Sequence, residues 1–256
     1  MFTVATIAHQ KLTGLDFDKV MVFPQGVFST ASLKALKSNN FTAAVNSGVF
    51  PVDSGGLKII DMLQQSVLFY ESFALFHRRY PLVIADFAFD LFLGKPALIV
   101  THHSHFKDGY KEISGFTGKI NLLDADLKWR GLEEIARNSY WQKKESDTQI
   151  YLKTCSNILH IDNDFTDTVK YSIMKYETNN IPLEGILVNG QKIDYSIANH
   201  FLKFDIDIKP KASTDIVIKF KNLYTNLKED TGMFEKVKIF TRRHLSEIRD
   251  DYISKI

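Results

Sequence analysis

Three histidines stand close together after a short apolar run. His102, His103 and His105 follow the run "ALIV" at 97–100. Histidine is a common metal ligand and titrates near neutral pH, so the cluster predicts metal binding or acid–base catalysis. The spacing matches neither the HExxH helix of zinc proteases nor a Cys–His zinc motif. The alternative is one buried, hydrogen-bonded histidine beside solvated loop histidines.

Two further segments carry residues suited to ligand binding. Pro24, Gln25 and Gly26 follow the apolar run at 18–23. A Pro-x-Gly between a strand and a helix makes a rigid turn, and ligands of α/β proteins bind at the carboxyl ends of strands. Arg78, Arg79 and Tyr80 precede Pro81 and could hold a carboxylate, a phosphate or a sugar. The alternatives are an ordinary loop and a salt-bridged surface loop.

The first part of the chain alternates between strand and helix patterns. Runs at 18–23, 41–46 and 97–100 predict short buried strands. Ser29 is an N-cap for a helix over 29–40. A second helix ends before Gly94 and Pro96, and its predicted buried face consists of Ile84, Phe87, Ala88, Leu91 and Phe92. Asp86 and Asp90 would lie on its polar face. We therefore expect an α/β domain over 1–142.

The pattern changes to a period of two after a polar stretch, "QKKESDT" at 142–148, which is typical of a linker. Alternating runs around 168–176, 186–193, 201–208 and 215–220 predict short strands, and Asn189-Gly190 is a hairpin signal. These runs predict a small antiparallel β-sandwich over 148–222. Helical spacing returns near the end and predicts a C-terminal helix over 233–256.

Composition limits the class of protein. The 256 residues carry a net charge of +2, which does not indicate a nucleic-acid partner. Cys155 is the single cysteine, so no internal disulfide forms, and a small core residue is its expected role. We identify no signal peptide and no apolar stretch long enough to span a membrane, so a cytoplasmic location is the default expectation.

The α/β part resembles the C-terminal part of the polysaccharide deacetylase homology domain. "VMVFPQGVFSTASLKALKSNNFTAAVN" is similar to that family's strand-turn-helix-strand segment, and "KPALIVTHH" is similar to its late strand with a Leu-x-His type motif. The resemblance spans roughly residues 18–135 and implies an irregular (β/α) barrel. It also implies removal of acetyl groups from polysaccharides with a divalent metal, usually zinc. In that family an aspartate acts as base and the late histidine as acid.

Carried over by position, the late histidine is His102 or His103, and the turn motif is Pro24 and Gly26. Phe23 stands where the family has an arginine before the turn. The family's metal-binding aspartate and His-x-x-x-His pair have no counterpart upstream, where His9 is the only histidine. No metal ligand is therefore assigned, and zinc is implied by the resemblance alone. We expect a missing or separately encoded N-terminal portion, or a partner chain.

Three functions follow as hypotheses. The first is a deacetylase-like hydrolase acting on a polysaccharide or acetylated sugar, inactive alone, with catalytic His102 and His103 and a substrate-binding set of Pro24, Gln25, Gly26, Arg78, Arg79 and Tyr80. The second is a non-catalytic carbohydrate-binding or assembly protein that stacks sugars on Phe69, Tyr70, Phe73 and Phe76. The third is a structural subunit completed by another chain across an open sheet edge. The sequence does not decide between an enzyme and a binding protein.

Overall fold

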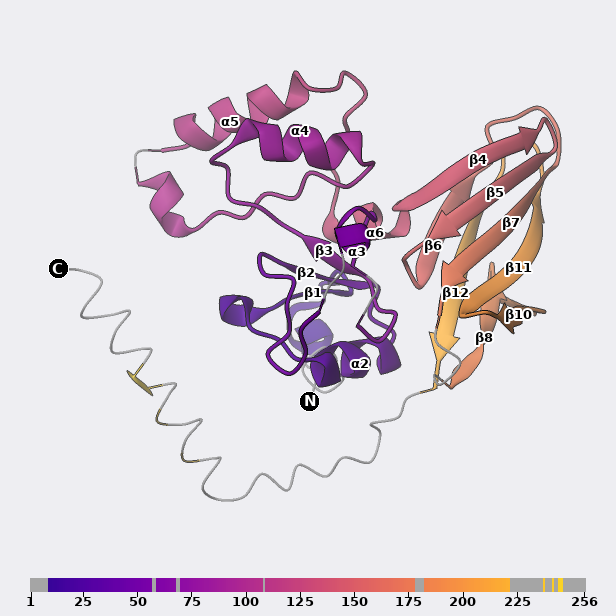
Figure 1. Cartoon of the computed structure of the whole chain (residues 1–256), viewed down its shortest axis with the longest axis horizontal. Helices are drawn as coiled ribbons and strands as arrows, with labels where there is room; N and C mark the ends of the chain where they lie inside the picture. Colours follow the sequence, from indigo (N-terminus) through magenta and orange to yellow (C-terminus); the bar gives the residue numbers. More distant parts are fainter. Residues whose placement is uncertain are drawn as a thin grey trace. The chain divides into compact units, whose positions relative to one another are not determined.

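The computed structural model describes residues 9–56, 59–67, 70–107, 109–177 and 182–221, together with positions 237, 241, 244 and 245. Residues 1–222 form one compact unit and 223–256 a second. The described residues have a mixed α/β fold with three sheets, none of which closes into a barrel (Figure 1). The helix predicted over 233–256 lies outside the described residues except at those four positions, which are helical.

A three-stranded parallel sheet begins the fold. Its order is β1 (Val20–Val22), β2 (Ala43–Asn46) and β3 (Leu75–His77). Beyond β3, Arg79 and Ile99 form a parallel bridge, so the run at 97–100 lies beside the continuation of β3. The strands predicted at 18–23 and 41–46 are confirmed. The strand predicted at 97–100 is reduced to this bridge.

Both faces of the parallel sheet are covered, which explains the continuous apolar runs. On one face, Leu33 and Leu36 of α2 (Thr30–Ser38) pack in a buried cluster with Ala44 and Leu75. Ser29 caps α2 as predicted, because its side chain accepts from the Ser32 backbone N–H while the Ser32 hydroxyl accepts in return. On the other face, α6 (Leu132–Arg137) covers a second cluster that contains Ala43, Val45, Phe76, Ala136 and Cys155.

The remaining helical elements of this part are short. They are the helical residues 9–13, η1 (Pro24–Gly26), α3 (Ile59–Met62), α4 (Ile84–Phe92), η2 (His103–Phe106) and α5 (Lys111–Asn121). Gly94 ends α4 with φ +68°, as its predicted cap role requires.

The predicted buried face of α4 is wrong in two places. Phe87 is buried and contacts Phe116 of α5 edge to face, but Phe92 is 83% exposed. Asp90, expected on the polar face with Asp86, is buried. The reason is that Arg79 reaches α4 from the strand side and pairs with Asp90.

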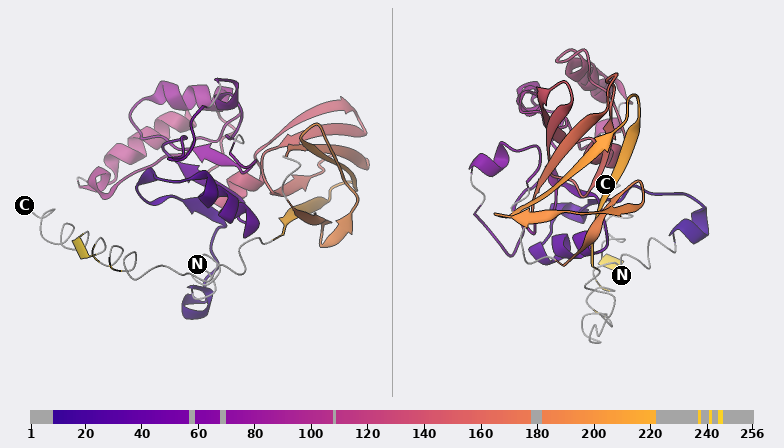
Figure 2. Two further views of the ribbon diagram at one scale, coloured as in Figure 1. Left: turned by 60° about the horizontal axis from the view of Figure 1, so that its bottom comes forward. Right: turned by 90° about the vertical axis from the view of Figure 1, so that its right-hand side faces the viewer.

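Within the described ranges, nine strands form two facing sheets around one apolar core (Figure 2). The first sheet has the order β10-β11-β7-β5-β4 and the second β6-β12-β8-β9. The strands are β4 (Tyr140–Ser146), β5 (Gln149–Thr154), β6 (Ile158–Asp162), β7 (Val169–Tyr176), β8 (Leu183–Val188), β9 (Gln191–Ile193), β10 (Ser196–Ala198), β11 (Phe201–Ile208) and β12 (Ser213–Phe220). The hairpin predicted at Asn189-Gly190 joins β8 and β9.

Two expectations about this β-sandwich are corrected. The sandwich is not purely antiparallel: β5 and β7 pair in parallel, because β6 crosses to the opposite sheet and the chain returns beside β5 in the same direction. The polar stretch at 142–148 is not a linker but most of β4 and the turn into β5. A strand at a sheet edge is often charged, which is why its sequence resembles a linker.

Among the described helices, none has the length and apolar character needed to cross a bilayer.

Candidate functional site

Several of the predicted site residues lie along the carboxyl edge of the parallel sheet. Since parallel strands end on the same side, the segments that follow β1, β2, β3 and the bridge at Ile99 emerge at one edge. In order along this edge they contribute Pro24–Gly26, Asn46, His77, Tyr80 and His102. We call this row the carboxyl edge.

The Pro-Gln-Gly turn is fixed by a buried asparagine. Asn46, the last residue of β2, donates through Nδ2 to the carbonyl oxygens of Gly26 at 2.8 Å and Gly48 at 2.9 Å. Gln25 and Gly26 both have positive φ, +55° and +69°, so the turn has the tight form that the sequence predicted. Pro24 and Gln25 are exposed. The turn therefore presents two side chains at the edge on a rigid backbone.

Phe23, which stands where the resemblance has an arginine, belongs to the core. Its ring is buried and stacks on Phe28 with centroids 5.1 Å apart. The residue is thus a packing residue, and no cation occupies its place before the turn.

His77, which no sequence pattern singled out, is a further candidate site residue at this edge. Its Nε2 lies 2.9 Å from the Ser47 carbonyl oxygen, and because a carbonyl only accepts, Nε2 carries the proton. Burial, and secondarily Arg79, lower the pKa of His77 below its usual value, so the ring is neutral at pH 7. Nδ1 is then an acceptor, and it is buried without a hydrogen bond among the described residues.

Asn46 also ends its strand with a buried acceptor. It is the register partner of His77, so both side chains lie on the same face of the sheet. Its Oδ1 is buried and has no hydrogen bond within the described part of the chain. Both residues were detectable in principle, since each follows a buried apolar run as the histidines at 102 and 103 do.

Arg79 forms an ion pair with Asp90 of α4. Its Nε lies 2.6 Å from Oδ2 of Asp90 and a terminal nitrogen 3.2 Å from Oδ1, with 27% and 6% of the two side chains exposed. The bidentate hydrogen bond raises the pKa of Arg79 further above its usual value. Arg78 is half-buried, and its backbone N–H donates to Asn46. Arg79 therefore ties α4 to the sheet and keeps the loop before Tyr80 in place.

Tyr80 and His102 meet at the end of the carboxyl edge. The Tyr80 hydroxyl and His102 Nε2 share a hydrogen bond of 3.0 Å, and the two rings stack with centroids 5.8 Å apart. Tyr80 is 40% exposed, and His102 is exposed as well. The segments 78–80 and 101–103, predicted separately, are thus brought together. An exposed imidazole held by a phenol can donate or accept a proton, the role of a general acid or base.

The other histidines have different settings. His105 Nδ1 accepts from the His102 backbone N–H at 3.3 Å, which helps to fix the loop. His103 is exposed at the start of η2.

The donor set does not fit the zinc that the resemblance implies. In the described ranges, no group of three or more His, Cys, Asp or Glu side chains is placed to hold a metal ion. His102 is bonded to Tyr80 rather than grouped with a carboxylate. We therefore derive no step that passes through a metal.

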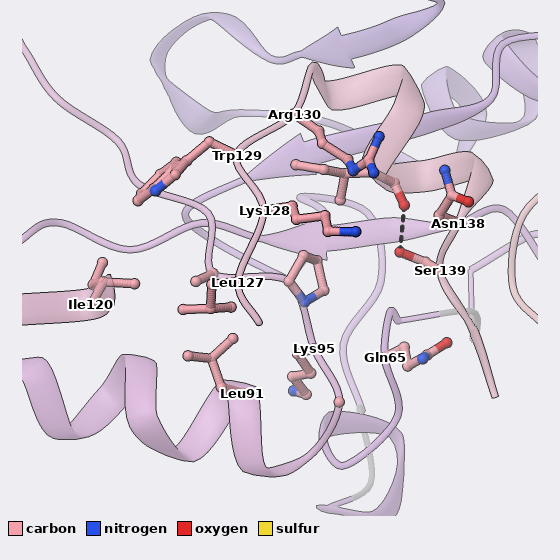
Figure 3. A pocket seen from close by; sticks show the side chains of 14 residues that line it. Gln65, Leu91, Lys95, Ile120, Leu127, Lys128, Trp129, Arg130, Asn138 and Ser139 are labelled. Carbon is pink, nitrogen blue, oxygen red and sulfur yellow. Dashed lines mark hydrogen bonds between the residues drawn. The ribbon is translucent and has the colours of Figure 1, made fainter. Parts of the chain in front are cut away.

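A separate pocket lies away from the carboxyl edge, where α4 ends and the run at 97–100 begins. Its volume is about 270 Å³, and Leu91, Ile120 and Leu127 form an apolar wall (Figure 3). Lys128 extends across it toward Asn138 and Ser139. None of the predicted site residues lines this pocket.

Comparison of the chain with protein-family models, curated proteins and solved structures gave no match.

Proposed function

We propose that this protein is a deacetylase-like, carbohydrate-active protein that binds an acetylated sugar or polysaccharide along the carboxyl edge. In this proposal the parallel sheet is an open part of an irregular (β/α) barrel. The strand order supports it, because β1, β2, β3 and the segment at Ile99 are neighbours in chain order, each parallel to the one before. Short helices separate these strands along the chain.

The observation that carries the proposal is the Tyr80–His102 pair. A polar pair at the carboxyl end of neighbouring parallel segments, on the same sheet edge as a rigid exposed turn, is the arrangement in which α/β proteins hold ligands. His102 can bond a sugar hydroxyl or acetamido group, and move a proton, through Nδ1, because Nε2 is bonded to the Tyr80 hydroxyl. Tyr80 orients the ring and offers its own face to a pyranose.

Hydrolysis requires more than these residues supply. The described donor set does not form the metal site that the resemblance implies, so the proposal assigns metal ligands to a segment or partner chain outside this sequence. The chain alone then binds acetylated sugar without releasing acetate.

The test is calorimetric titration with chitohexaose in its fully N-acetylated form, with acetate release followed in the same samples with and without zinc. Binding to the unaltered chain is expected to weaken at least tenfold in His102→Ala and in Tyr80→Phe, and to persist in His200→Ala, an exposed histidine of the sandwich. No binding, or equal binding by all four proteins, would contradict the proposal. Acetate release by the chain alone would contradict its inactivity.

The non-catalytic binding function is the second candidate, favoured by the same lack of a metal-ligand group in the described residues. Its predicted stacking surface is not available, however: Tyr70, Phe73 and Phe76 are buried core residues, and Phe69 lies outside the described residues. Elemental analysis of the native assembly separates the two functions. Near-stoichiometric zinc supports the hydrolase, whereas no zinc and no acetate release support binding alone.

A further inference from the structure

The outer face of the five-stranded sheet holds a groove of about 430 Å³ that no part of the proposed function uses. It crosses β4, β5, β7 and β11 on the face opposite the sandwich core. The volume lies within the range of sites that hold a small molecule or a short segment of a polymer.

The strand register arranges the groove in two adjacent rows. One row runs through Trp141, Lys153, Met174 and Lys203, and the next through Lys143, Tyr151, Ser172 and Asp205. Lys143 is paired with Glu145 at 3.2 Å. Residues two apart on a strand lie on the same face, about 7 Å from each other. The register therefore places aromatic and cationic side chains side by side over several strands.

Tyr151 is the flat surface in the groove. It lies on β5 between two inward-facing residues and is 49% exposed, although its ring is large and apolar. Trp141 closes one end, with Lys153 Nζ placed 5.2 Å from the centre of its ring. An exposed aromatic ring beside hydrogen-bonding groups matches a sugar ring, which has an apolar face and a polar rim.

The charges of the groove are unbalanced. Lys153 bonds to an amide oxygen, Oε1 of Gln64, and Lys203 has no ion pair among the described residues. The one carboxylate in the two rows, Asp205, is already paired with Lys170 at 2.9 Å. Two ammonium groups are thus left to meet an anion, and lysine binds carboxylates through charge-assisted hydrogen bonds.

We propose that this groove binds an acidic polysaccharide, in which one uronate ring stacks on Tyr151 and carboxylates of neighbouring uronate residues meet Lys153 and Lys203. This surface is separate from the carboxyl edge and goes beyond the function proposed there. In this proposal the sandwich binds one part of an acidic polymer. The carboxyl edge then reaches acetylated positions on the same polymer.

The test is titration of the full chain with hexagalacturonate, with maltohexaose as the neutral sugar and single-stranded oligo(U) as the nucleic-acid control. Hexagalacturonate is expected to bind at least tenfold more tightly than either control. Tyr151→Ala and Lys203→Glu should each weaken binding about tenfold. The matched variants Tyr195→Ala and Lys209→Glu, exposed on other parts of the sandwich, should leave it unchanged. Raising the salt concentration should weaken binding, because the charges are at the surface.

The proposal would be overturned if hexagalacturonate did not bind, if maltohexaose bound equally well, or if oligo(U) bound more tightly. Unchanged hexagalacturonate binding in Tyr151→Ala and Lys203→Glu would also overturn it. Thermal melting confirms that each variant is folded. His102→Ala should retain hexagalacturonate binding, so a failure at the carboxyl edge remains distinguishable from a failure here.

Discussion

Lys37 of α2 and Glu177, which follows β7, form an ion pair of 2.6 Å across 140 residues of sequence, and both side chains are almost fully buried. A second buried lysine, Lys175, binds the other carboxylate oxygen at 3.0 Å. Both ammonium groups also donate to the Ser72 carbonyl oxygen in the loop before β3. This cluster joins the parallel-sheet part to the sandwich through one carboxylate and two cations.

Removing the carboxylate should be far more harmful than removing one lysine. Glu177→Gln leaves two buried ammonium groups without their counter-ion and is expected to lower the free energy of unfolding by about 3–5 kcal/mol. Lys37→Met leaves the Lys175–Glu177 pair intact and should cost less than about 1.5 kcal/mol. Urea denaturation of the two variants measures the difference. Equal losses would show that Glu177 is not the shared counter-ion of the two lysines.

The same cluster predicts a pH dependence of stability. Burial, then the neighbouring Lys175, lower the pKa of Lys37 to about 7, although Glu177 and Glu71 oppose the shift. Between pH 7 and 10.5 the unfolded chain keeps a proton on Lys37 that the folded protein has released, so the free energy of unfolding should rise with pH, by up to about 1.4 kcal/mol per unit. Below pH 7 this contribution is constant.

Denaturation at a series of pH values checks this slope. Lys37→Met should lose it, whereas Lys34→Met, an exposed lysine one turn earlier on α2, should keep it. If the free energy of unfolding of Lys37→Met still rose with pH in this range, groups other than Lys37 would be responsible for the pH dependence.

The stability of the protein should depend on the buried carboxylate of Asp90 in α4 and not on the exposed carboxylate of Asp86. Asp90→Asn removes the charge that Arg79 binds twice, and we expect a loss of about 1.5–3 kcal/mol in the free energy of unfolding. Asp86→Asn, one turn earlier and exposed, should cost about 0.5 kcal/mol or less. Thermal melting of the two single variants compares them directly, and a similar shift in both would refute the buried-pair account.

The Pro-Gln-Gly turn should depend on Asn46. Asn46→Ala removes the donor to two carbonyl oxygens and should cost about 2–3 kcal/mol, whereas Asn138→Ala, an exposed asparagine with one such bond, should cost less than about 1 kcal/mol. Gly26→Ala should cost about 1 kcal/mol, because φ is +69° there. Chemical denaturation supplies the values. Free energies unchanged in both turn variants would mean that the turn is not held as described.

Local signals in the sequence predicted local structure well. The Ser29 cap, the Gly94 stop and the Asn189-Gly190 hairpin each depend on a few neighbouring residues, and all three occur in the structure. The period of two likewise predicted β7, β11 and β12, since one face of each is buried, but the charged edge strand β4 was mistaken for a linker.

The long-range features could not be predicted in this way. Helical spacing placed Asp90 on a polar face because nothing near it shows that Arg79 arrives from another element. The same spacing could not show that the Phe92 side of α4 lacks a covering element, or that the aromatic run around Phe73 and Phe76 is buried. The Tyr80–His102 contact joins two segments whose chemistry was recognised but whose pairing depends on the strand order.

The most direct measurement of the central claim is a nitrogen-15 NMR titration of the imidazole side chains with fully N-acetylated chitohexaose. The eight histidines are few enough to assign by substitution. Binding at the carboxyl edge predicts that His102 and His77 shift with the same saturation curve, while His160, paired with Asp215 in the sandwich, does not. Shifts confined to histidines outside the carboxyl edge, or no shift at all, would contradict the account.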